Sequence, residues 1–125
     1  MKFYMSENYG SIITKLSSDG AALSANGKEL ALVQPGAVDA AVEKHVPAVQ
    51  VNGNQVLVNV GEVNHPMTAE HYIPWIVLES SHGAQIRWLQ PTDAPSVSFL
   101  LADGEEPKVV YAYCNLHGLW KKELN

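Results

Sequence analysis

Cysteine is almost absent from this chain of 125 residues: it has one, so no internal disulfide can form. Nothing therefore indicates a secreted, cross-linked scaffold. No stretch approaches the apolar length of a membrane span, and residues 1–7 lack the long apolar run of a signal peptide. We therefore expect a soluble, cytoplasmic protein with no membrane partner.

Positive charge is scarce as well. The chain has 8 lysines and arginines against 13 aspartates and glutamates, which makes a net charge of −5. Binding to nucleic acid needs a basic surface, so we expect no nucleic-acid partner. An anionic substrate would have to be attracted locally, by a few placed cations, because the field of the whole molecule repels it.

The hydrophobic content, 46%, is ordinary for a protein that buries a core. The first part of the chain, residues 1–36, reads as a small β-rich unit with short strand-like runs at 2–5, 11–16 and 28–33. Asn26-Gly27 is a hairpin signal within it. Because this unit has few large apolar residues, we expect it to pack on the rest or on a second copy, and we expect a homodimer.

The larger part of the chain, residues 37–125, is predicted to be a second domain that begins after Gln34-Pro35-Gly36. Residues 38–45 suit a short helical turn or a loop. Strand candidates then follow at short intervals, at 48–51, 55–60, 72–79, 85–89, 96–101 and 108–114. Many short strands separated by turn-formers predict an all-β sandwich of Greek-key type.

The sole cysteine lies in a C-x-x-H pattern, Cys114 to His117, in which thiolate and imidazole can reach one metal ion from a tight turn. Asn115 and Gly118 suit such a turn, since both tolerate unusual backbone dihedrals. Backbone N–H groups there can point at the sulfur and lower the pKa of the thiol. A lone cysteine is more often a small buried apolar residue, so the motif needs support from elsewhere.

That support comes from the histidines. Four of the five lie beside turn or break residues, namely His45, His65, His71 and His117, whereas His82 falls at an expected hairpin tip and reads as a surface residue. Taken singly, each suits a hydrogen-bonded structural role. Four imidazoles and one thiolate exceed what tetrahedral zinc needs and would suit a five-coordinate ion with an open sixth position.

Three segments carry a resemblance to a known family: residues 43–47 (EKHVP), 65–76 (HPMTAEHYIPWI) and 114–120 (CNLHGLW). They resemble the superoxide reductases, the desulfoferrodoxin and neelaredoxin proteins. The resemblance implies an immunoglobulin-like β-sandwich that carries one mononuclear, non-haem iron. It implies an equatorial plane of histidine nitrogens and an axial thiolate, from His45, His65, His71, His117 and Cys114.

The same resemblance implies the reaction, a one-electron reduction of superoxide to hydrogen peroxide. Lys44 would lie near the open face and attract the anion, and Glu43 would occupy the sixth position once the iron is ferric. An external donor, by resemblance rubredoxin, would return the electron. Apolar residues of the C-x-x-H region, Leu116, Leu119 and Trp120, are candidate docking residues, although core packing is the expected role of Trp120.

The N-terminal unit resembles the small desulforedoxin-like domain of longer family members, with one departure. That domain holds a rubredoxin-type iron through four cysteines, and the corresponding positions here are Ser6, Tyr9, Ala25 and Asn26. We therefore expect a metal-free relic that serves packing or dimer formation.

Three alternatives follow from the residues alone. A blue-copper electron carrier also combines a β-sandwich with one cysteine and histidines, but no methionine follows His117, four histidines are too many, and no export signal is present. A zinc or structural metal module and a metal-free β-sandwich binding domain remain the others.

Overall fold

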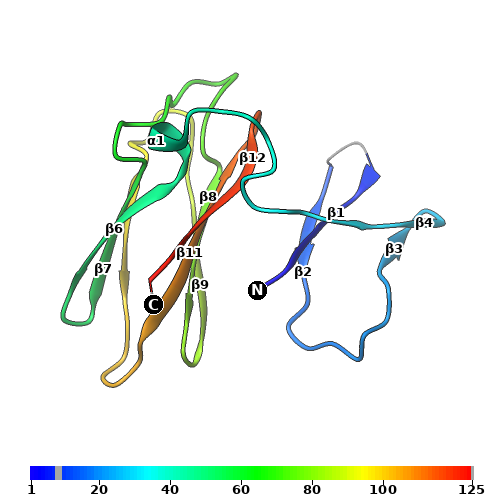
Figure 1. Ribbon diagram of the computed structural model, residues 1–125, viewed down its shortest axis with the longest axis horizontal. Coiled ribbons are helices and arrows are strands. Elements are labelled where there is room, and N and C mark those ends of the chain that lie inside the picture. Colours follow the sequence, from blue (N-terminus) through cyan, green and yellow to red (C-terminus); the bar gives the residue numbers. More distant parts are fainter. Residues whose placement is uncertain (8–9, 125) are drawn as a thin grey trace. The chain divides into compact units, whose positions relative to one another are not determined.

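The computed structural model describes residues 1–7 and 10–124, and nearly all of its regular structure is β-strand (Figure 1). The all-β fold class is thereby confirmed. The chain forms two compact units, Met1–Gln34 and Pro35–Asn125, so the division comes after Gln34 rather than after Gly36. Gly36 belongs to the larger unit, where its N–H donates to the carbonyl of Leu119 (2.8 Å). Among the described residues, no helix has the length and apolar character needed to span a bilayer.

The smaller unit contains a three-stranded antiparallel sheet and a two-residue hairpin. The sheet has the order β2-β1-β5, with β1 at Phe3–Met5, β2 at Ile12–Thr14 and β5 at Ala31–Leu32. The hairpin pairs β3 (Ser24–Ala25) with β4 (Lys28–Glu29). Asn26 and Gly27 both have positive φ, 52° and 77°, which is the turn that Asn-Gly favours, so the predicted hairpin is confirmed.

The positions where relatives would carry thiolates hold other groups here. The Ser6 hydroxyl accepts the N–H of Ser11 (2.9 Å), Ala25 ends β3, and Asn26 lies in the turn. Tyr9 lies outside the described residues. None of the three described side chains is a thiolate ligand, and the role of this unit as a metal-free relic stays a prediction.

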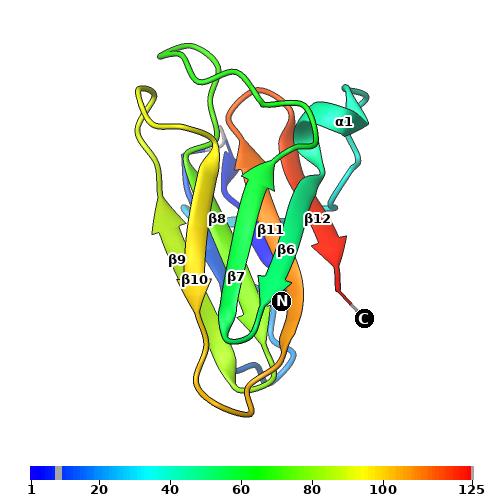
Figure 2. The ribbon, with the colours of Figure 1, turned by 90° about the vertical axis from the view of Figure 1, so that its left-hand side faces the viewer.

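The larger unit is a sandwich of two antiparallel sheets (Figure 2). One has the order β10-β7-β6 and the other β12-β11-β8-β9. The strands are β6 (Pro47–Asn52), β7 (Gln55–Val60), β8 (Trp75–Ser80), β9 (Gly83–Trp88), β10 (Ser96–Leu100), β11 (Pro107–Cys114) and β12 (Gly118–Glu123). After each hairpin the chain crosses to the other sheet, and β10 returns to lie beside β7. This is a Greek-key connection, as predicted.

Alternation along the strands places apolar side chains between the two sheets. On β7, Val56, Val58 and Val60 are at most 2% exposed, and they share one core cluster with Ile76 and Phe99. Burying such a side chain contributes about 1.5–3 kcal/mol relative to leaving it in water. The core therefore holds the two sheets together and makes their upper end in Figure 2 a rigid base for the loops and α1 (Val42–His45).

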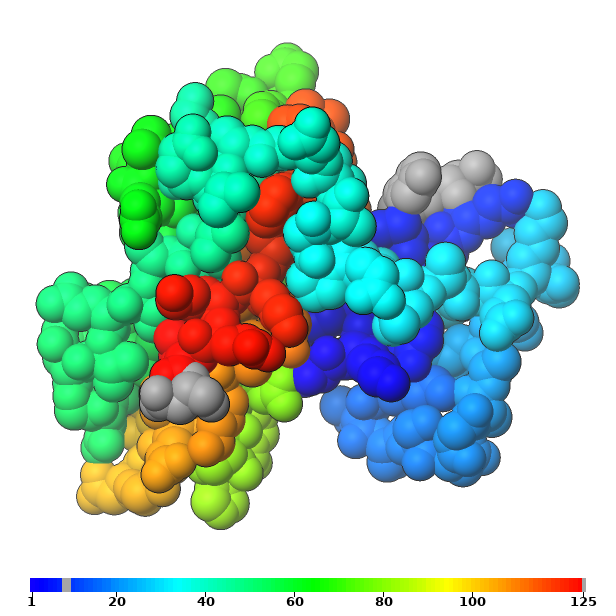
Figure 3. Space-filling view, in the orientation of Figure 1, coloured from blue at the N-terminus to red at the C-terminus, as the bar shows by residue number. Residues whose placement is uncertain are grey.

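Two strand predictions need correction. Strand β8 begins at Trp75 instead of Tyr72, because the N–H of Tyr72 donates to the side chain of Asn115 and not to a neighbouring strand. Strand β12, which sequence patterning missed, pairs with β11 so that Cys114 lies opposite Gly118. In Figure 3 the atoms of β12, in red, lie beside the cyan segment that precedes α1.

Candidate metal centre

Helix α1 brings three of the expected site residues together at one end of the sandwich. It is a single turn, because Val46 is extended (φ −71°, ψ 124°) ahead of Pro47, as a residue before proline prefers. His45 is only 3% exposed, whereas Glu43 and Lys44 are exposed. The turn thus directs the imidazole inward and leaves the two charged side chains in solvent.

Four side chains from separate segments offer ligand atoms within 4.8 Å of one another: His45, His65, His71 and Cys114. His45 ends α1, His65 and His71 lie in the loop between β7 and β8, and Cys114 ends β11. Three of them are buried, and His71 is half-buried. Strand pairing and the packing of the two sheets bring these three segments together, because they are distant in sequence.

His117 closes a belt of four imidazoles. Around the belt His45–His65–His71–His117, neighbouring ring centroids lie 4.7, 4.6, 5.0 and 4.9 Å apart, with interplanar angles of 81°, 84°, 77° and 83°. Across it, the rings of His45 and His71 lie 6.4 Å apart at 29°. His117 Nδ1 is 3.1 Å from His45 Nε2 and 3.8 Å from Cys114 Sγ. His117 is not among the four residues within 4.8 Å of one another, but its Nδ1 lies beside two of them, His45 and Cys114.

Hydrogen bonds to carbonyl groups orient two of these rings. His45 Nδ1 donates to the carbonyl of Ala41 and His65 Nδ1 to that of Pro66, each at 2.7 Å. A carbonyl only accepts, so the proton resides on Nδ1 and the lone pair of Nε2 faces the belt. This is the outer contact that metal-binding histidines commonly make.

The donor set fits a metal ion. Nε2 of His65 and of His71 is buried without a hydrogen-bond partner, and a buried polar atom left unpaired is costly. A cation at the centre of the belt would satisfy both nitrogens at once. Imidazole and thiolate donors suit iron, copper and zinc.

Burial favours the neutral form of three imidazoles, those of His45, His65 and His71. It lowers the pKa of His65 to about 4, with a smaller contribution from the neighbouring histidines. Burial likewise lowers the pKa of His45 and of His71. The charge of Lys44 lowers both of these pKa values further, which places its ammonium group within electrostatic range of the belt. Neutral imidazoles are the form that binds metal.

The pKa of the Cys114 thiol differs from the sequence-based expectation. Backbone N–H groups of Leu116 and His117 do point at the sulfur of Cys114, the latter at 3.4 Å, and they lower its pKa. Burial, however, outweighs them, so the pKa of the thiol is raised overall. A bound cation would reverse this balance, because a thiol that coordinates a metal loses its proton.

The structure confirms some of the remaining expectations and contradicts one. His82 is exposed at the β8–β9 turn and lies apart from the belt, as predicted. Leu116 is 58% exposed, whereas Leu119 is 3% exposed, so the proposed docking role of Leu119 is wrong. Trp120 is buried as expected; its ring lies 5.0 Å from that of His45 and its indole N–H donates to the carbonyl of His117 (3.1 Å).

Sequence reasoning missed Gly61, whose lack of a side chain allows the backbone of α1 to pack closely against it. A Cβ atom there would lie 2.7 Å from the carbonyl oxygen of Glu43 and 2.8 Å from that of Val46. The N–H of Val63 also donates to the Glu43 carbonyl (2.9 Å). No local pattern reveals this requirement, because the helix that approaches Gly61 is distant in sequence.

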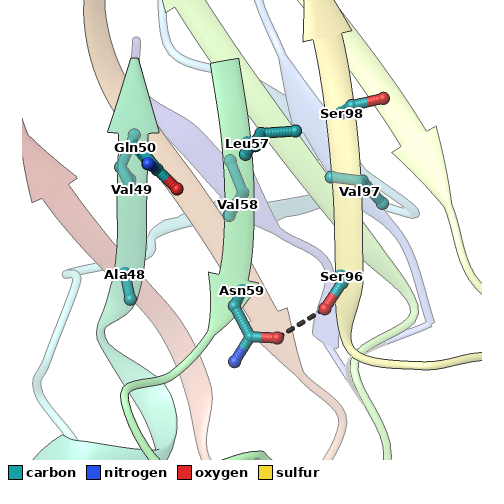
Figure 4. Close-up of a pocket in the computed structure, with 9 residues that line it drawn as sticks. All are labelled: Ala48, Val49, Gln50, Leu57, Val58, Asn59, Ser96, Val97 and Ser98. Atoms are coloured by element: carbon teal, nitrogen blue, oxygen red, sulfur yellow. Dashed lines mark hydrogen bonds between the residues drawn. The ribbon is translucent and has the colours of Figure 1, made fainter. Parts of the chain in front are cut away.

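A hollow on the outer face of β6, β7 and β10 is separate from the metal centre (Figure 4). Among its lining side chains are Leu57, Asn59, Ser96 and Ser98, and the Ser96 hydroxyl donates to the Asn59 side chain. The residues that line it include no histidine, cysteine or charged group. We assign it no chemistry.

The fold and the centre together define a class of protein, a Greek-key β-sandwich with one histidine- and cysteine-lined metal centre at the end of the sandwich. The desulfoferrodoxin family model matches residues 37–123. The chain is 40% identical to a desulfoferrodoxin of Clostridium acetobutylicum over 124 residues, which is 99% of this chain and 97% of that protein. It therefore belongs to the desulfoferrodoxin family, as the resemblance in the sequence indicated.

Solved structures agree with this assignment. The superoxide reductase from Treponema pallidum matches with a TM-score of 0.81 and 36% identity, over 98% of this chain and all of that one. The superoxide reductase (1Fe-SOR) from Giardia intestinalis matches with a TM-score of 0.57 and 32% identity, over 66% of this chain and 98% of that one.

Proposed function

We propose that this chain is a superoxide reductase, which converts superoxide with one electron and two protons into hydrogen peroxide. The observation that carries the proposal is the belt of four imidazoles beside the Cys114 sulfur, in which Nε2 of His65 and of His71 is buried and unpaired. Iron held by His45, His65, His71, His117 and Cys114 would supply the electron. The name of the Giardia intestinalis relative, superoxide reductase (1Fe-SOR), supports this choice of metal.

In this proposal, the positive charge of Lys44 attracts the anionic substrate. The chain carries a net charge of −5, so its overall field repels superoxide. The charge of the exposed Lys44 lowers the pKa of His45 and of His71, so Lys44 provides a local positive charge that acts on the belt. Such local fields raise association rates by about tenfold or more.

Glu43 is the candidate sixth ligand. It precedes Lys44 on the same exposed turn, and its charge raises the pKa of His45, so its carboxylate acts on the belt from solvent. Its backbone carbonyl is anchored by Val63. Movement of the carboxylate toward the belt would therefore be a rotation of the side chain on a fixed turn.

An external one-electron donor completes the cycle. The chain has a single cysteine, so it has no four-cysteine iron centre to act as a second redox group. Rubredoxin is the donor that we propose, and exposed Leu116 beside the centre is its candidate contact. A homodimer, the cytoplasmic location and the packing role of the N-terminal unit stay predictions.

Metal analysis and an absorption spectrum of the purified, iron-loaded protein test the proposal. We expect one iron per chain and a visible thiolate-to-iron band after oxidation, which disappears on reduction and in Cys114→Ser. A His82→Ala variant, which changes an exposed histidine away from the belt, should keep the band. Copper or zinc bound in place of iron, or an iron-loaded chain that does not consume superoxide in pulse radiolysis, would refute the assignment.

A further inference from the structure

Asn115, between the two ligands of the C-x-x-H turn, makes contacts that its expected role as a turn residue does not explain. Its side-chain Oδ1 accepts the N–H of Tyr72 (2.9 Å), and its Nδ2 donates to the carbonyl of Glu70 (3.0 Å). Its backbone N–H donates to the carbonyl of Tyr72 (3.2 Å). Three hydrogen bonds therefore join the turn to the residues on either side of His71.

His71 is the histidine that most needs this support. The rings of His45 and His65 are each oriented by a hydrogen bond from Nδ1 to a carbonyl. Within residues 1–7 and 10–124, the His71 ring has no such bond, and its Nε2 is buried without a partner. The position of this ring therefore depends on its backbone.

The backbone around His71 has two anchors. On one side, the N–H of His71 donates to the hydroxyl of Thr68 (3.1 Å), and the N–H of Thr68 donates to the carbonyl of His71 (3.0 Å). This closes a local turn but does not attach it to the rest of the centre. The attachment to the strand that carries Cys114 comes from Asn115.

We propose that Asn115 is a positioning residue, which ties the loop of His71 to the Cys114–His117 turn and so sets where His71 presents Nε2. The inference rests on the proposed metal centre. A carboxamide suits the place because it accepts and donates at once. Asn115→Asp keeps the acceptor for Tyr72 but loses the donor, and it sets a negative charge against the Glu70 carbonyl.

Cobalt(II) binding by the full-length, metal-free chain tests the proposal. Affinity is measured by competition with a chelator, and coordination is read from the visible ligand-field bands and the near-ultraviolet thiolate-to-cobalt band. In Asn115→Asp and Asn115→Ala we expect about tenfold weaker binding, as for other outer partners of metal ligands. The visible bands should intensify as the coordination number falls, while the thiolate band persists because Cys114 still binds.

Asn54→Ala is the matched control. Asn54 lies in the β6–β7 turn, at the opposite end of the sandwich, and its side chain donates to Asp103. Its loss should leave cobalt binding unchanged. If circular dichroism shows that Asn115→Ala does not fold, the cobalt binding of Asn115→Asp tests the proposal.

Two results would overturn the role of Asn115. One is wild-type affinity and spectrum in the folded variant, and the other is loss of the thiolate band together with the change in the visible bands, which would mean that the whole turn had moved. Failure of the proposed metal centre looks different, because then the wild-type chain itself shows no thiolate-to-cobalt band. Failure of the proposed reaction is read separately, from an iron-loaded wild-type chain that does not consume superoxide.

Discussion

Acid should destabilise the metal-free protein well above the pH at which its carboxylates titrate, because buried His65 must take up a proton. Its pKa is about 4 in the folded chain against an ordinary 6.5, and the side chain is 2% exposed. Each pKa unit corresponds to about 1.4 kcal/mol. The protonation of His65 alone should therefore lower the free energy of unfolding by about 3 kcal/mol between neutral pH and pH 4, a large share of the 5–15 kcal/mol typical of a domain.

The sign follows from proton linkage. The folded state binds the proton more weakly than the unfolded state, so the contribution is fully present above pH 6.5 and declines as the pH falls toward 4. Burial also lowers the pKa values of His45 and His71, which adds loss in the same direction. The free energy of unfolding should fall most steeply with pH midway between the folded and unfolded pKa values of His65.

Urea unfolding at several pH values between 7.5 and about 4.5, with a chelator present, measures the effect. His65→Leu should flatten the dependence, and His82→Gln, which alters an exposed histidine, should keep it. Should the leucine variant fail to fold, nuclear magnetic resonance of wild-type His65 gives its pKa directly. A value near 6.5 in the folded, metal-free chain, or an unfolding free energy that stays constant over this range, would contradict the reasoning.

Three further changes test separate parts of the structure. Lys44→Ala should bind iron normally, react about tenfold more slowly with superoxide, and show a weaker dependence on ionic strength in pulse radiolysis. Gly61→Ala should cost about 1–3 kcal/mol in urea unfolding, since its Cβ would overlap the carbonyls of Glu43 and Val46. Phe99→Ala should cost about 3–5 kcal/mol in the same assay, because the ring is 1% exposed in the core.

Each of these changes has a matched control. Lys108→Ala removes one positive charge at the opposite end of β11 and should leave the rate with superoxide unchanged. Gly83→Ala adds a Cβ with no atom within 4 Å, and Leu100→Ala truncates a side chain that is 71% exposed, so both should have little effect on stability. Equal effects in a variant and its control would argue against the corresponding contact.

Much of the fold could be predicted from local patterns. Alternating apolar residues and turn-formers located β6, β7, β10 and most of β11, and Asn26-Gly27 marked its hairpin correctly. Strand β12 was missed because Gly118–Glu123 does not alternate, and it becomes a strand through its pairing with β11. Burial of Leu119 likewise depends on this pairing and could not be read from its neighbours in sequence.

The sequence by itself determined the donor chemistry: one thiol, imidazoles beside turn residues, and a lysine and a glutamate next to His45. Tertiary structure alone decided that His45 and His117, 72 positions apart, lie at one point, that Gly61 must lack a side chain, and that Asn115 joins two ligand-bearing segments. Residue types follow from the chain, but distances between remote residues follow only from strand register and sheet packing.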